Sequence, residues 1–96
     1  MKLVQVIFQF QYTERIEALL RGQGIDFMSI YPLIDGWDAD GKHDGSQAFP
    51  GHLTVVQAEV PEERLDALFD DLRKFREEKK THRHLQALVL PVDRRL

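Results

Sequence analysis

The sequence predicts an α+β fold in which a four-stranded antiparallel sheet carries two helices on one face. Three observations predict it: four short segments with a strand-like apolar pattern, two segments with apolar residues at helical spacing, and their order, which is β-α-β-β-α-β. The chain has 96 residues, which is the size of one domain. We therefore expect residues 1–96 to form a single domain.

The first half of the chain predicts two strands and a helix. Residues 2–11 alternate in period two, which gives one face of Val4, Val6, Phe8 and Phe10 and another of Leu3, Gln5, Ile7, Gln9 and Gln11. Thr13 has the chemistry of an N-cap, and residues 14–21 form a short amphipathic helix before Gly22. Residues 27–34 form the second strand. Because Pro32 cannot donate to a central ladder, this strand should lie at an edge of the sheet or bend.

The second half of the chain predicts two more strands around a longer helix. Residues 52–60 form the third strand, and Pro61 fits the first position of a helix over about residues 62–78. Residues 79–84 form a polar connector, and residues 85–90 form the last strand.

This element order is the ferredoxin-like arrangement, which leaves one face of the sheet without helices. The candidates for that face are apolar or neutral amides: Leu3, Gln5, Ile7 and Gln9, with Gln57 or Gln86 depending on the register. An uncharged face of this kind suits an interface between copies of the chain, where amides pair with each other. The alternative is a solvated face that carries no charge.

Composition excludes several classes of protein. A formal net charge of −3 argues against a nucleic-acid-binding module. The absence of cysteine excludes disulfides and thiol chemistry. No apolar run has membrane-spanning length and no signal peptide is recognisable, so we expect a cytoplasmic protein without membrane insertion. No catalytic set emerges, so we do not expect an enzyme.

Three segments carry a resemblance to a known family. They are "KLVQVIFQF…TERIEALLRGQGIDFMSI", "FPGHLTVVQAEVPEERLDALFDDL" and the ending "ALVLPVDRRL". They resemble the PII signal-transduction family and its PII-like relatives, which are trimers of ferredoxin-like subunits with a long loop between the second and third strands. The resemblance places this loop at residues 34–51. It implies a non-enzymatic homotrimeric regulator in which an adenine nucleotide binds at subunit clefts and the loop alters docking to a regulated protein.

The ligand residues implied by this resemblance are only partly present. Gly36 and Trp37 match the loop entry, Asp38 stands where the family has its next glycine, and the cations that remain are Arg83, Arg94 and Arg95. The glycine-rich phosphate cradle is missing. The four aspartates Asp35, Asp38, Asp40 and Asp44 against Lys42 disfavour a triphosphate unless a metal ion intervenes.

A divalent metal is the alternative ligand, as in the divalent-cation tolerance (CutA) family, which has similar trimeric subunits. His43, Asp44 and His52 are donors in the loop, and His82 and His84 lie on the connector. The spacing of "DADG" does not fit a calcium-binding EF-hand loop. The remaining interpretation is a solvated loop whose Asp and Gly residues form turns.

Overall fold

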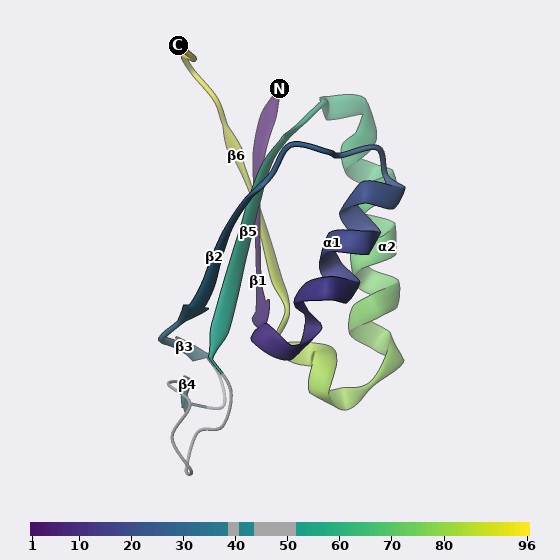
Figure 1. The fold of residues 1–96 in the computed structure, drawn as a ribbon. Helices are drawn as coiled ribbons and strands as arrows, with labels where there is room; N and C mark the ends of the chain where they lie inside the picture. Colours follow the sequence, from purple (N-terminus) through teal and green to yellow (C-terminus); the bar gives the residue numbers. More distant parts are fainter. Residues whose placement is uncertain (39–40, 44–51) are drawn as a thin grey trace.

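The computed structural model describes residues 1–38, 41–43 and 52–96. Its main elements follow the predicted order: β1 (Lys2–Gln9), α1 (Thr13–Gly22), β2 (Ser29–Ile34), β5 (Leu53–Val60), α2 (Leu65–Glu78) and β6 (Gln86–Pro91). Three 3₁₀ turns join them: η1 (Phe10–Tyr12), η2 (Glu62–Arg64) and η3 (Lys80–His84). Both helices cover the same face of the sheet (Figure 1), so the predicted ferredoxin-like fold is confirmed.

The sheet has the order β2-β5-β1-β6, and all its neighbouring strands are antiparallel. β2 is an edge strand, as Pro32 predicts, because the missing N–H of proline is tolerated where no neighbour needs it. Its pairing with β5 also shifts register between Tyr31 and Ile34. The strand is therefore both an edge strand and irregular.

The core lies between the sheet and the two helices. Alternate residues of the central strands face it, and the apolar stripes of both helices complete it. Its largest fully buried side chains include Phe8, Ile16, Leu20, Leu68 and Phe75. The period-two and helical patterns of the sequence thus identify the buried residues.

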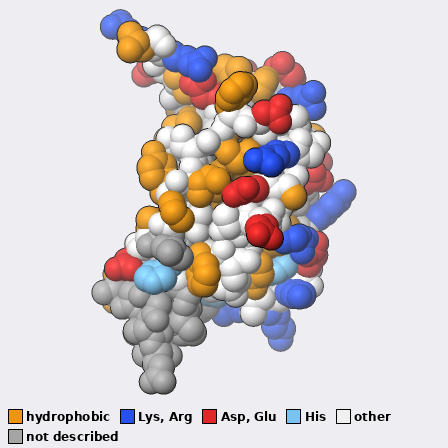
Figure 2. All heavy atoms as spheres, in the orientation of Figure 1, with side chains coloured by type: hydrophobic (Ala, Val, Ile, Leu, Met, Phe, Trp, Pro, Cys, Tyr) orange, Lys and Arg blue, Asp and Glu red, His pale blue; other side chains and the backbone are white. Residues whose placement is uncertain are grey.

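The opposite face of the sheet carries no helix and almost no charge. Gln5 lies opposite both Gln57 and Leu88 in the register, so the three share this face, and Gln5 Nε2 donates to Gln57 Oε1 at 3.2 Å. Gln86 lies opposite Ile7 on the same face. Among the described strand residues that pair in this sheet, Glu59 is the one charged residue on this face. Figure 2 shows hydrophobic side chains on the sheet side, whereas charged side chains mainly cover the helical side.

Two local predictions were wrong. β1 ends at Gln9 because Phe10–Tyr12 turn into a 3₁₀ helix. Thr13 is not an N-cap: it is the first helical residue, and its Oγ1 donates backwards to the carbonyl of Phe10 at 2.6 Å. A hydroxyl that bonds to a preceding carbonyl cannot accept from the N–H groups of the first turn.

The segment predicted as the long loop contains a second, two-stranded sheet. β3 (Gly36–Asp38) pairs with β4 (Gly41–His43), and Trp37 lies opposite Lys42. Asp44, a predicted metal ligand, lies outside the described residues. In the part of the chain that the structure describes, no helix has the length and apolar character needed to cross a bilayer.

Candidate functional site

The sheet has two ends at which predicted ligand residues lie. The first, which we call the loop end, is where β2 leads into β3 and where η3 leads into β6 (Figure 1). The second, the tail end, holds the start of β1 and residues 92–96 after β6 (Figure 1). Each end has a hollow in its surface, and the predicted ligand residues are divided between the two ends.

The loop-end hollow has a volume of about 190 Å³. Trp37, Asp35 and Ile34 line it from the loop base, and His84 and Gln86 line it from the connector and β6. The fold therefore brings together Trp37 and His84, two predicted site residues that are distant in sequence. Trp37 is 73% exposed, so most of its surface is accessible to solvent.

His52 contacts the loop base through Asp35. Its Nδ1 lies 3.3 Å from Asp35 Oδ1, which is an ion-pair distance if the imidazole is protonated. The two atoms are not aligned as a hydrogen bond, and this solvent-shielded nitrogen has no hydrogen-bond partner among the described residues. His52, a predicted metal donor, thus lies beside Asp35, a carboxylate that was not predicted as a metal ligand.

His82 lies in the core, where the sequence led us to expect a polar connector. Its side chain is 2% exposed, and its Nδ1 donates to the carbonyl of Phe75 at 2.7 Å. Its ring stacks on Phe75 at 3.9 Å and meets the edge of Tyr12 at 4.6 Å. Binding a metal through Nδ1 would require breaking the bond to the helix carbonyl. In this conformation His82 holds η3 against α2.

The other predicted residues of the loop end are placed by backbone contacts. Arg83 lies in η3, and its Nη1 donates to the carbonyl of Lys80 at 3.1 Å. Gly36 pairs with His43, and Asp38 pairs with Gly41, in the β3–β4 sheet. Among the described residues, no group of three or more His, Cys, Asp or Glu side chains is arranged to hold a metal ion.

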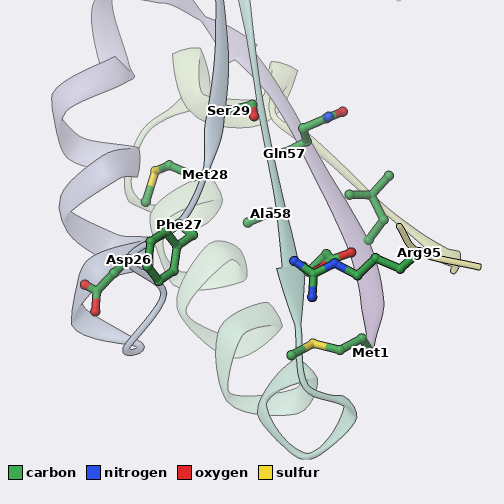
Figure 3. A pocket seen from close by; sticks show the side chains of 10 residues that line it. Met1, Asp26, Phe27, Met28, Ser29, Gln57, Ala58 and Arg95 are labelled. Carbon is green, nitrogen blue, oxygen red and sulfur yellow. The ribbon is translucent and has the colours of Figure 1, made fainter.

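The tail-end hollow is larger, with a volume of about 780 Å³. Figure 3 shows Phe27 and Met28, which precede β2, on one side of it and Arg95 on the other. Arg95 Nε lies 3.2 Å from Glu59 Oε2, on the rim of β5. The hollow exists because the pairing of β2 with β5 begins only at Ser29 and Gln57, so the segment before Ser29 diverges from the sheet.

Sequence reasoning missed most of this second hollow. It predicted Arg94 and Arg95 as cations of the site, but not residues 26–29 or the β5 residues opposite them. The one signal available was Phe27, an aromatic residue at the start of a predicted strand, which is 92% exposed. The tail-end hollow also carries polar groups that suit a nucleobase or sugar, in Ser29 and Gln57.

Comparison with solved structures identifies the fold. The chain is similar to CPII, a nitrogen regulatory PII-like protein from Thiomonas intermedia K12 bound to ADP, AMP and bicarbonate, with a TM-score of 0.76 at 21% identity over 93% of this chain and 88% of that one. A structure of CPII bound to ADP and bicarbonate gives a TM-score of 0.72 at 23% identity over 97% and 88% of the two chains.

A candidate PII-like signaling protein from Thermus thermophilus gives a TM-score of 0.62 at 19% identity over 92% of this chain and 82% of that one. The sequence matches no family model. It also matches no curated protein at a significant level. The similarity to PII-like proteins that the sequence predicts is thus found in the fold, at an identity too low to carry function.

Proposed function

We propose that this chain is a PII-like regulatory protein that assembles as a homotrimer and binds an adenine nucleotide in the clefts between its subunits. It acts without catalysis, through the segment 34–51, whose conformation responds to the bound ligand and alters docking to a regulated protein.

The observation that carries this proposal is the division of the ligand residues between the two ends of the sheet. Trp37 lines the hollow at the loop end, and Arg95 lines the hollow at the tail end. One chain cannot bring these residues to the same ligand, because the length of the sheet separates them. Two copies that meet loop end to tail end can do so, and each would supply one half of the site.

The chemistry of the two halves suits a nucleotide. At the tail end, Met28 offers an apolar surface to a base, while Ser29 and Gln57 offer hydrogen-bonding groups for its edge. Arg95 offers a guanidinium, which binds phosphate in a bidentate manner. Its contact with Glu59 is on the surface, with Arg95 71% exposed, so exchanging the carboxylate for a phosphate costs little.

Ligands of the structural neighbours support the same class of effector. CPII is described with ADP, AMP and bicarbonate. ADP suits this chain better than ATP, because the loop base carries Asp35 and further aspartates that repel additional phosphate charge. A ligand in the loop-end hollow would touch Trp37, which belongs to β3, so binding would act directly on the segment that follows β2.

The test combines calorimetry with light scattering on the full chain. Titration with ADP, AMP and ATP, each with and without bicarbonate, is expected to give saturable binding that is tightest for the mono- or diphosphate. Size-exclusion chromatography with light scattering is expected to give the mass of a trimer. The proposal is refuted if the protein is a monomer at micromolar concentration, or if none of the three nucleotides binds.

The contact of His52 with Asp35 favours a metal ion as the second candidate ligand, as in the CutA-like alternative. A neutral imidazole and a carboxylate are suitable donors for zinc or copper. Calorimetry with each metal, on the parent and on His52→Ala, tests it. We expect affinity that His52→Ala abolishes and that Lys80→Ala, a change at an exposed site, leaves unchanged. A parent protein without affinity for either metal would remove this candidate.

A further inference from the structure

Phe27 is an unusually exposed aromatic residue on one edge of the sheet. Its side chain is 92% exposed, and it stands just before the edge strand β2. Asp26 precedes it, and this carboxylate has no ion-pair partner among the residues that the structure describes. Burial of a phenyl ring is strongly favourable, so an aromatic ring held in water next to an unpaired charge indicates a surface that meets a partner.

A hollow of matching character lies at the opposite edge of the sheet. This edge hollow has a volume of about 240 Å³ and lies between α2 and the other edge strand, β6. Phe69, Leu72, Leu85 and Ala87 supply its apolar lining. A cavity of about 150 Å³ with such a lining is known to accept benzene, so this hollow has room for one phenyl ring.

The charges beside the two features are complementary. Arg73 and Arg76 lie at the mouth of the edge hollow. Arg73 Nη1 is bound to Asp70 Oδ1 at 3.1 Å. Arg76 has no ion-pair partner within the described part of the chain, and so it matches the unpaired Asp26 beside Phe27.

We propose that Phe27 of one copy of the chain inserts into the edge hollow of a second copy, with Asp26 facing Arg76. We take the occupant to be a second copy because the charges beside Phe27 and beside the edge hollow are complementary. A single chain cannot make this contact, because β2 and β6 are opposite edges of its sheet. Such a contact joins different surfaces of the two chains, so each copy both gives and receives a phenyl group, and a closed assembly is a ring of copies. This contact rests on the proposed homotrimer. It determines which edge of one subunit meets which edge of the next.

Charge reversal tests this contact in the full chain. Asp26→Arg and Arg76→Asp, made singly, are each expected to raise the dissociation constant of the assembly by about tenfold or more. The double variant, in which the two charges exchange places, is expected to recover assembly to nearly the parent value. Phe27→Ala is expected to weaken assembly to a similar degree, since the anchor ring is lost. Glu63→Arg, at an exposed site before α2, is the matched control and should leave assembly unchanged.

Sedimentation at several concentrations measures the assembly, and far-ultraviolet circular dichroism checks that each variant is folded. A parent that assembles and does not respond to either reversal or to Phe27→Ala overturns this contact and leaves the proposed function standing. Two impaired single variants without recovery in the double variant overturn the pairing of Asp26 with Arg76. A parent that is monomeric overturns the proposed assembly and this contact together.

Discussion

His82 should stabilise the protein through one hydrogen bond that a phenylalanine cannot make. The carbonyl of Phe75 is one of the last four of α2, which have no partner within the helix, and His82 Nδ1 donates to it at 2.7 Å. In His82→Phe the ring is kept, so the stacking on Phe75 at 3.9 Å is retained while the carbonyl is left buried without a donor. An unsatisfied buried acceptor costs about 1–3 kcal/mol.

His82→Ala removes the ring as well. Loss of the aromatic contacts with Phe75 and Tyr12 adds about 0.5–1.5 kcal/mol, for a total of about 1.5–4.5 kcal/mol before any cavity is counted. Because domains of this size are stable by about 5–15 kcal/mol, both variants should fold at 25 °C and differ in their urea midpoints. The order of stability should be parent, then His82→Phe, then His82→Ala.

Urea denaturation followed by circular dichroism at 222 nm measures this order. Lys80→Ala is the control, since its side chain is exposed in the same 3₁₀ turn and its removal should change stability by less than about 0.5 kcal/mol. If His82→Phe is as stable as the parent within that margin, the hydrogen bond to Phe75 contributes nothing and the reasoning fails. An altered slope in urea would instead indicate a change in the denatured state.

Three further predictions concern the ligand, the open face and two glycines. Arg95→Ala should weaken ADP binding by about tenfold or more in calorimetry, because a charge-assisted bond is lost, while Arg21→Ala on exposed α1 should not; equal affinities would exclude Arg95 from the site. Leu88→Asp places a charge on the open face and should give a monomer in light scattering, and an unchanged mass would move the interface elsewhere. Gly22→Ala should raise the free energy of unfolding by about 0.4–1 kcal/mol. Gly24→Ala should lower it by about 1–2 kcal/mol, because Gly24 has a positive φ of 80°. A Cβ at either glycine would have no neighbour within 4 Å, so the two variants differ only in backbone conformation. Shifts of the same sign in thermal unfolding would contradict this.

The main elements of the fold follow from the sequence because their signals are local. Val4, Val6 and Phe8 alternate with Leu3, Gln5, Ile7 and Gln9, and this period of two puts the three wholly apolar positions on the buried face of β1. Pro32 predicts an edge strand because proline has no backbone N–H to donate to a second neighbouring strand. The start of α1 is less predictable. The hydroxyl of Thr13 could accept a hydrogen bond from the N–H groups of the first turn or donate one to a preceding carbonyl, and in the structure it donates to the carbonyl of Phe10.

The candidate site is less visible in the sequence because it depends on long-range placement. The imidazole of His82 looks like part of a polar run, and only the packing of η3 on Phe75 and Tyr12 explains its burial. Arg95 could be named as a ligand residue, but nothing local says that the last residues of the chain lie beside Glu59. The sequence places Trp37 just after the second strand, but only the folded structure shows that it lines the same hollow as His84.

The prolines at the two edges of the sheet have a consequence for aggregation. Pro32 stands within the register shift of β2, and Pro91 ends β6, so each outer strand lacks one donor that a growing ladder needs. An exposed regular edge is a template for uncontrolled strand addition, and proline is one way in which natural sheets prevent it. The two prolines thus disfavour strand addition at both edges of a sheet that presents an uncharged face. Replacing either proline with valine should increase aggregation of the protein while its circular dichroism spectrum stays that of the parent.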